Sequence, residues 1–227
     1  MSPDRLAVVG TGTGVGKTVI TAGLTAWLCE AGVDARAVKP AQTGHPPDDD
    51  AAFVADVCAD PDAATCLRYL EPPLAPRVAA EREDVSLSYD DLLADCERAL
   101  EECEVGILEG IGGLRVPIAG DREVIDLVAD LECDAVVVAR SGLGTLNHTA
   151  LSVDALAARG VDVRAVVLNE YAGETVAERT NPAELERMTD QPVVTVPPLA
   201  ALDTEHVIAA VRDALSTVET LSLVPTA

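Results

Sequence analysis

The stretch VVGTGTGVGKT at residues 8–18 decides the fold, because it joins a short apolar run to a Gly-Lys-Thr signature. The standard phosphate-binding loop reads G-x-x-x-x-G-K-[ST], which would place its first glycine at position 11. Residue 11 is Thr11, and the nearest glycine is Gly10, one position further back. The dinucleotide pattern G-x-G-x-x-G fails from every glycine of the stretch. The stretch therefore indicates a phosphate-binding loop with one additional residue.

The residues of this loop suit an anionic ligand. Glycines let backbone N–H groups converge on a phosphate, and the following helix adds the positive end of its dipole. Lys17 is expected to reach the β- and γ-phosphates of a nucleotide, and Thr18 to hold Mg²⁺. We expect the additional residue to widen the loop beside the γ-phosphate. The alternative is a tight strand–helix turn without a ligand.

Short apolar runs alternate with longer helical patterns along the rest of the chain, and their continuous apolar character is typical of strands buried on both faces. The expected strands are 6–10, 35–39, 105–109, 135–139, 164–168 and 193–196. The expected helices are 17–31, 50–58, 89–102, 123–131, 146–159, 182–189 and 203–216. This alternation predicts an α/β fold with a mostly parallel sheet flanked by helices.

The chain length of 227 residues favours a single P-loop NTPase-like domain over residues 1–227. The segments 43–50 and 71–86 are expected to be surface loops, and the tail from about residue 218 to be weakly ordered. No apolar span reaches the length of a membrane helix, and no signal peptide opens the chain.

The amino-acid composition limits the kinds of partner and environment that suit the protein. The chain carries 39 acidic against 16 basic residues, a formal charge of −23, which disfavours nucleic acid and anionic membranes. It has only two lysines, Lys17 and Lys39, and almost no Phe or Trp, a combination that predicts adaptation to a high-salt cytoplasm; the alternative is an ordinary acidic protein of a mesophile. In a chain so poor in lysine, a surviving lysine is expected to do what arginine cannot. The six cysteines form no C-x-x-C pair and are expected to be free thiols in a reducing cytosol.

Polar residues follow several of the expected strands, where ligands gather in parallel sheets. Lys39 opens KPAQTG at 39–44, and Glu109 lies in ILEGIGG at 107–113. Their alternatives are a solvated loop lysine and a loop-capping glutamate. The cluster 48–50 offers both a helix cap and a Mg²⁺ ligand, and the spacing leaves the two open. GLGTLNHT at 142–149 reads as an anion-binding helix start or as ordinary capping.

These motifs, in this order, resemble those of the dethiobiotin synthetase family over roughly residues 6–200. The family's G-x-x-x-x-x-G-K-T is matched from Gly10 to Thr18, and its lysine–proline segment by KPAQTG. EGIGG at 109–113 matches its E-G-x-G-G, and GTLNH at 144–148 its glycine–x–x–asparagine–histidine stretch. Asn169 in VVLNE and VPPL at 196–199 match its adenine-proximal asparagine and its late I-P-x-L.

The resemblance implies a cytoplasmic, homodimeric, ATP- and Mg²⁺-dependent ligase of biotin biosynthesis. It would close the ureido ring of dethiobiotin from 7,8-diaminopelargonic acid and CO₂. The diamine first forms a carbamate, which attacks the γ-phosphate, and the second amine then closes the ring and expels phosphate. Two anions must meet in this reaction, which demands cations and a metal around them.

The resemblance also assigns roles residue by residue. Lys17 and Lys39 would be catalytic, and the metal would be held by Thr18, Asp50 and Glu109. The nucleotide would be bound by Gly14, Val15, Gly16, Lys17, Thr18, Val19, Asp50, Glu109, Gly110, Gly112, Asn169, Pro197, Pro198 and Leu199. The substrate would be contacted by Thr13 and Thr43, and its carboxylate by Gly144, Thr145, Leu146 and Asn147 of the other subunit.

The chain departs from the family at three places. Many members carry Asp where Gly12 stands, and some carry Glu where Gly14 stands, so the loop has to work through its backbone there. The family's tyrosine near the substrate tail has no clear match, and Asn181 lies near the equivalent place.

Three other readings compete. A partitioning-type ATPase would carry a signature lysine five residues before the loop lysine, where Gly12 stands. A cobyrinate-type amidotransferase would need a glutaminase domain, for which 227 residues leave no room. A nucleotide-binding regulator without synthetase activity would not require both lysines and three metal ligands.

Overall fold

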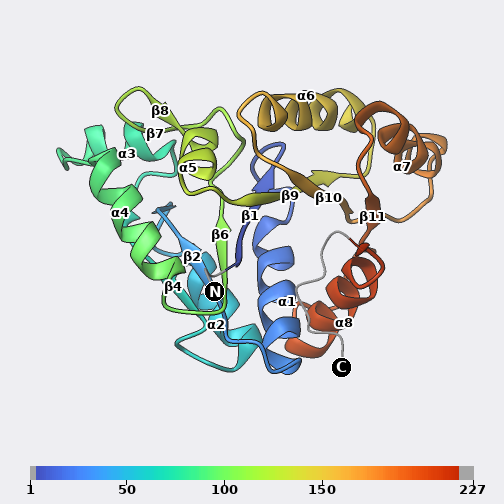
Figure 1. Cartoon of the computed structure of the whole chain (residues 1–227), viewed down its shortest axis with the longest axis horizontal. Coiled ribbons are helices and arrows are strands. Elements are labelled where there is room, and N and C mark those ends of the chain that lie inside the picture. Colours follow the sequence, from blue (N-terminus) through green and yellow to red (C-terminus); the bar gives the residue numbers. More distant parts are fainter. Residues whose placement is uncertain (1–3, 220–227) are drawn as a thin grey trace.

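Seven parallel strands form one sheet through the middle of the computed structural model, which describes residues 4–219 (Figure 1). The strand order is β11-β10-β9-β1-β6-β2-β4. Their bounds are β1 Asp4–Gly10, β2 Ala35–Lys39, β4 Ala64–Cys66, β6 Val105–Glu109, β9 Asp134–Arg140, β10 Val163–Asn169 and β11 Val193–Thr195. All adjacent pairs in this sheet are parallel, so the predicted α/β fold with a parallel sheet is confirmed.

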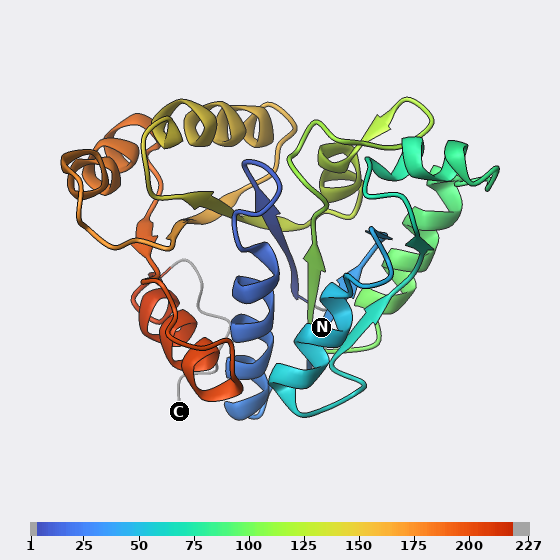
Figure 2. The same ribbon diagram turned by 180° about the vertical axis from the view of Figure 1, so that it is seen from behind.

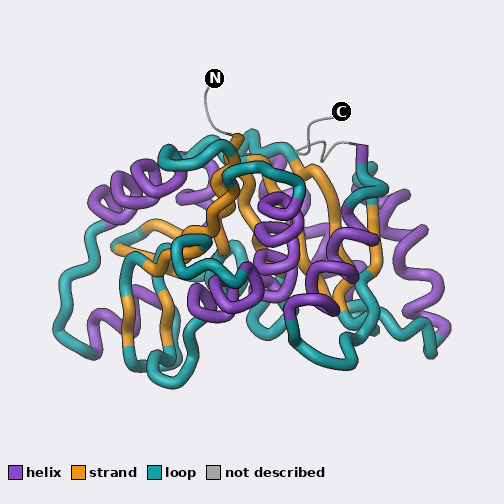
Figure 3. Tube along the Cα trace, turned by 90° about the horizontal axis from the view of Figure 1, so that it is seen from below, coloured by secondary structure: helices purple, strands orange, loops and turns teal. Residues whose placement is uncertain are grey.

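Helices cover both faces of the sheet (Figures 1 and 3). One face carries α1 Lys17–Glu30, α2 Asp50–Cys58 and α8 Thr204–Leu215, and Figure 2 shows α1 standing beside α8. The other carries α4 Tyr89–Leu100, α5 Val124–Asp130, α6 Thr145–Ala157 and α7 Val176–Thr189. None of the helices described between residues 4 and 219 is long and apolar enough to cross a membrane.

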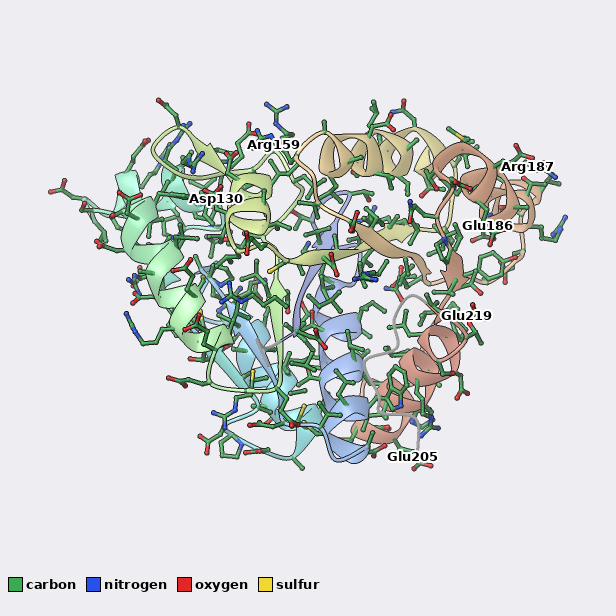
Figure 4. The ribbon with its side chains drawn as sticks, in the orientation of Figure 1. Asp130, Arg159, Glu186, Arg187, Glu205 and Glu219 are labelled. Atoms are coloured by element: carbon green, nitrogen blue, oxygen red, sulfur yellow. The ribbon has the colours of Figure 1, made fainter. Side chains whose placement is uncertain are left out.

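The hydrophobic core lies on both sides of the strands, which explains their continuous apolar runs. In β1, Val8 packs with α1 and α8, whereas Val9 packs with the helices of the opposite face. Full burial of such a side chain contributes about 1.5–3 kcal/mol. Charged side chains lie on the outside, as Figure 4 shows for Arg187 on α7 and Glu205 on α8.

The prediction for α7 was wrong at its start. The helix begins at Val176 rather than at 182, and Pro182 lies inside it. A capping box sets this start: Thr175 Oγ1 accepts from the Glu178 backbone N–H at 3.1 Å, and the Glu178 carboxylate accepts from the Thr175 N–H at 3.0 Å. The predicted start at residue 182 overlooked the Thr-x-x-Glu signal that begins at Thr175, seven residues earlier.

The prediction of a loop over 71–86 was also wrong, because α3 Pro76–Arg82 lies within it, with Pro76 in the first turn. Two short pairs were missed as well: parallel β3 Gln42–Thr43 with β5 Tyr69–Leu70, and antiparallel β7 Pro117–Ala119 with β8 Arg122–Glu123. Strands this short carry no periodicity in the sequence. The loop predicted over 43–50 is present between the end of β3 and the start of α2. The tail predicted from about residue 218 lies almost wholly outside the described residues.

Candidate functional site

Five strands of the central sheet end in residues that lie together at its carboxyl edge. They are Gly10 of β1, Lys39 of β2, Glu109 of β6, Arg140 of β9 and Asn169 of β10. Parallel pairing brings these ends to one side of the sheet, where ligands bind in open α/β folds. The sequence motifs that follow these strands therefore form one site.

Two glycines of the phosphate loop are required by close contacts. Gly16 has φ +94° and caps α1, and a Cβ there would lie 2.0 Å from Asn169 Nδ2. That amide donates to the Val15 carbonyl at 3.1 Å, so the end of β10 holds the loop. A Cβ on Gly10 would lie 2.9 Å from the Val15 side chain. Both glycines of the longer loop are thus excluded from carrying a side chain.

Lys17 is buried beneath the loop and bridges it to the loop after β6. Its Nζ donates to the Gly12 carbonyl at 3.0 Å and to the Gly112 carbonyl at 2.9 Å. Burial, together with the nearby Lys39 ammonium, lowers its pKa to about 8, against the opposing effect of Glu109 and Asp50. Lys17 is therefore mostly a cation at neutral pH, and its Nζ donates to two backbone carbonyls rather than to a carboxylate.

Lys39 lies at the centre of an ion-pair cluster. Its Nζ contacts the Asp50 carboxylate directly and donates to Glu109 Oε1 at 2.8 Å, and Thr18 Oγ1 donates to the same Glu109 oxygen at 2.9 Å. Lys39 is 5% exposed and Glu109 2% exposed. Burial would lower the pKa of Lys39, but the two carboxylates outweigh it and raise that pKa. Lys39 therefore stays protonated across the physiological range.

The two carboxylates have different environments. Burial raises the pKa of Glu109, and the Lys39 ammonium only partly opposes that rise. Burial also acts to raise the pKa of Asp50, but Lys39 outweighs it and holds that pKa below its usual value. Asp50 is oriented by its backbone N–H, which donates to Gln42 Oε1 at 3.2 Å. Its neighbour Asp49 instead caps α2, accepting from the Ala52 N–H at 3.0 Å.

The oxygen donors of this cluster suit Mg²⁺. The Thr18 hydroxyl and the Asp50 and Glu109 carboxylates surround one ammonium, so the place already accommodates a cation. Between residues 4 and 219 no three His, Cys, Asp or Glu side chains gather into a metal cage. Mg²⁺ rarely uses such a cage, since it binds through one or two carboxylates, water and substrate phosphates. The donor set fits a metal shared with a nucleotide.

A cavity of about 540 Å³ opens between the phosphate loop and the start of α6. Thr13 and Thr145 line it from the two sides, and Asn169 lines it from β10. Gly144 caps α6 with φ +92°, and Thr145 Oγ1 lies 3.2 Å from Thr149 Oγ1.

The other residues proposed for the α6 segment differ in exposure. Leu146 packs partly against the core, whereas Asn147 points to solvent. The structure thus places the α6 segment near the phosphate loop of the same chain.

The remaining nucleotide and substrate residues lie around this centre. Gly110 donates to the Val8 carbonyl at 2.9 Å, and Thr43 belongs to β3, beside Gln42. The segment after β11 adjoins the end of β10, because the Tyr171 N–H donates to the Val196 carbonyl at 2.9 Å. There Pro197 and Pro198 are exposed, and Leu199 packs against the cluster that Val19 also contacts.

Arg140 was not given a place by the sequence, and Asn181 was placed only near the position of the family's substrate-tail tyrosine. Arg140 ends β9 and its Nη2 donates to the Gly14 carbonyl at 3.4 Å, whereas the expected strand stopped one residue earlier. Asn181 is 4% exposed, and its Nδ2 donates to the Ser141 carbonyl at 2.8 Å and to the Gly142 carbonyl at 3.3 Å. Asn181 thus holds the loop before α6. An amide buried inside a helix was the available signal.

The fold and the loop define a nucleotide-binding protein of the phosphate-loop class. The family model described as an AAA domain matches residues 4–206. The septum site-determining protein MinD of Pyrococcus horikoshii, solved with Mg-ADP, has a TM-score of 0.60 over 99% of this chain and all of that chain, at 12% identity. That likeness concerns the fold alone.

Relatives by sequence are more specific. The ATP-dependent dethiobiotin synthetase of Haloferax mediterranei is 57% identical over 96% of this chain and 94% of that protein. Those of Anaeromyxobacter sp. strain Fw109-5 and Bacillus subtilis subsp. natto are 42% and 34% identical, over 81% and 91% of this chain and 85% and 92% of the relatives. The chain belongs to the dethiobiotin synthetase family, which confirms the resemblance seen in its motifs.

Proposed function

We propose that this protein is an ATP-dependent ligase that closes the ureido ring of dethiobiotin from 7,8-diaminopelargonic acid and CO₂. Membership of the dethiobiotin synthetase family supports the proposal. The observation that carries it is the joining of Lys17, Lys39, Thr18 and Glu109 at one edge of the sheet, beneath a phosphate loop. A carbamate and a phosphoryl group, both anionic, need such a concentration of cations to react.

The two lysines are suited to electrostatic roles. Lys39 has a raised pKa, so it acts as a permanent cation and not as a base. It would bind the carbamate and the phosphoryl group being transferred, while Lys17 steadies the charge that develops on the β- and γ-phosphates. The carbamate oxygen attacks the γ-phosphorus and ADP leaves. The second amine then attacks the carbonyl carbon, loses a proton and expels phosphate.

Thr18, Asp50 and Glu109 would hold Mg²⁺, which neutralises phosphate charge when bound. The loop residues Gly14, Val15, Gly16 and Val19 would surround the phosphates, with Gly110 and Gly112 opposite them. Asn169 and the segment 197–199 would bind the base. Their support is the contact of Asn169 with the loop and the backbone bond between the ends of β10 and β11.

Thr13 and Thr43 would contact the diamine or its carbamate, and Gly144, Thr145, Leu146 and Asn147 the carboxylate of a substrate bound to the other subunit of a homodimer. Exposed apolar side chains at this end of the molecule support a second copy there. Leu143 is 98% exposed, Leu151 of α6 60% and Val176 of α7 69%.

We propose small molecules and a second copy as the partners, in a high-salt cytoplasm. Nucleic acid and membranes do not fit a chain of net charge −23.

A product assay tests the function directly. Purified protein is incubated with the diamine, bicarbonate, MgATP and molar KCl, and dethiobiotin and ADP are measured by mass spectrometry. One dethiobiotin per ADP is expected, with none when bicarbonate or ATP is omitted. No product from a protein that still binds nucleotide would favour the second candidate, a regulatory or partitioning-type ATPase, for which the fold likeness to MinD is the observation. Gly12 stands against that candidate, since the partitioning class needs a lysine there.

A further inference from the structure

Arg140 places a guanidinium against the phosphate loop. It is the last residue of β9, its side chain is exposed, and its Nη2 donates to the Gly14 carbonyl at 3.4 Å. A Cβ built on Gly14 would lie 3.3 Å from the same nitrogen. The arginine from β9 therefore occupies the space beside Gly14 that a side chain of the loop itself would otherwise take.

This guanidinium is not committed to a carboxylate. Acidic residues outnumber basic ones 39 to 16 in the chain, yet within residues 4–219 Arg140 forms no ion pair. A guanidinium has five N–H donors, and the contact with Gly14 uses one of them at the long end of hydrogen-bond distances. Most of its donor capacity is available for an oxyanion.

Arg140 and Lys17 approach the loop from opposite sides of β1. Lys17 is bonded to Gly112 in the segment that follows β6, whereas Arg140 ends β9, and β6 and β9 are the two neighbours of β1. Figures 1 and 2 show the loop after β1 reaching toward α6, on the side where β9 ends. A ligand held by the loop therefore lies between two cations.

The formal charges at the site leave no net positive charge for a nucleotide. Lys39 is balanced by Asp50 and Glu109, so these three groups and Lys17 sum to zero formal charge. A magnesium–ATP complex still carries negative charge, and phosphoryl transfer to a carbamate adds more to the same place. Arg140 contacts the loop without an ion pair among residues 4–219, although Glu170 and Glu178 line the same cavity, and its planar fork suits phosphate oxygens.

We propose that Arg140 binds the nucleotide's phosphate chain beside Gly14 and stabilises the charge that develops there during phosphoryl transfer. This rests on the proposed synthetase function. The weak bond to the Gly14 carbonyl is exchanged for bonds to phosphate oxygens when nucleotide binds. Arg140 is thus a catalytic residue of the transfer step, supplied in cis by β9.

The test compares Arg140→Gln with Arg82→Gln, which removes the same charge from an exposed position in the last turn of α3. All proteins are measured at one KCl concentration. Dethiobiotin formation by Arg140→Gln is expected to fall on the order of a hundredfold in kcat, as for loss of one preorganised donor. Its affinity for ADP–aluminium fluoride is expected to fall by a similar factor and its affinity for ADP by about threefold or less. Arg140→Lys should recover part of the loss, and Arg82→Gln should match the wild type.

The outcomes separate the alternatives. Unchanged kcat and unchanged ADP–aluminium fluoride affinity would overturn the proposal. So would a rise confined to the KM for the diamine, which would assign the guanidinium to the substrate carboxylate instead. If the wild type makes no dethiobiotin, the proposed function fails, but the ADP–aluminium fluoride comparison still decides whether Arg140 binds the phosphate chain.

Discussion

Replacing Lys39 with methionine removes one ammonium from a buried cluster while keeping a side chain of similar length. Lys39 is 5% exposed and its partner Glu109 2% exposed. Without the ammonium, Glu109 and Asp50 are like charges with no counter-charge between them. Breaking a buried pair from one side costs about 3–5 kcal/mol. For a chain of this size that corresponds to a fall in melting temperature of about 6–20 °C.

The stability lost in Lys39→Met should depend on pH in a defined direction. Burial already raises the pKa of Glu109, and removal of Lys39 raises that pKa further, since the Lys39 ammonium opposes the rise more strongly than the hydrogen bond from Thr18. A group whose folded pKa lies above its unfolded value loses stability as the pH rises through that folded value. The free energy of unfolding of Lys39→Met should therefore be closest to that of the wild type in acid and furthest below it at neutral pH. In the wild type, the lowered pKa of Asp50 stabilises the folded protein at neutral pH, and this stabilisation is lost as the pH falls through that pKa.

Thermal and urea unfolding of apoprotein in molar KCl, between pH 4.5 and 8, measures this difference. Arg36→Met is the matched control, because Arg36 lies on the same strand in an exposed pair with Asp34 and should cost less than about 1 kcal/mol. Millimolar Mg²⁺ should restore part of the stability of Lys39→Met by binding the freed carboxylates. A variant as stable as the wild type at pH 7.5, with a parallel pH profile, would refute the account of the cluster.

Four further changes test the rest of the site. Lys39→Arg should lose most turnover but keep nucleotide affinity, because a planar guanidinium does not replace a compact ammonium; turnover assays with nucleotide titration decide this. Lys17 has a pKa of about 8, so ATP affinity should weaken as the pH rises above about 8, up to tenfold per pH unit, and Lys17→Arg should flatten that profile in titrations of fluorescent ATP. Gly16→Ala should lower melting temperature far more than Gly32→Ala, because both have positive φ but only position 16 meets an amide, at 2.0 Å. Asn181→Leu should cost about 1–3 kcal/mol in urea unfolding and raise the KM for the diamine alone, since it leaves two loop carbonyls unpaired; an equal rise in the KM for ATP would contradict this.

The sequence predicted the parts of the site that depend on local pattern. Strands buried on both faces read as apolar runs, so the ends of β2 and β6, with Lys39 and Glu109, were placed correctly. The start of α7 and the helix α3 were missed because the capping box at Thr175 and the proline in the first turn of α3 were not used as signals of a helix start. Both errors concern capping, where one or two residues decide the outcome.

The spacing of residues in the sequence could not predict contacts between segments that lie far apart along the chain. Lys39, Asp50 and Glu109 were each singled out, but nothing in their spacing said that one ammonium would hold both carboxylates. The spacing left Asp49 and Asp50 open and only the family resemblance chose Asp50, whereas the start of α2 shows that Asp49 is the helix cap. Arg140 was overlooked because an arginine after an apolar strand is ordinarily a solvated residue.

The additional residue of the phosphate loop lies next to the edge of the central sheet. Thr11 still belongs to the sheet edge, since its N–H donates to the Val138 carbonyl at 3.0 Å and it bridges to Gly113. The loop leaves the strand only at Gly12, whose carbonyl accepts from Lys17. Thr11 therefore stays attached to the sheet one residue beyond the end of β1 at Gly10. Beyond this point Lys17, which follows the last glycine of the loop, donates to the Gly12 carbonyl, and Arg140 of β9 donates to the Gly14 carbonyl, so a cation contacts each of the two glycines at which the chain departs from its family.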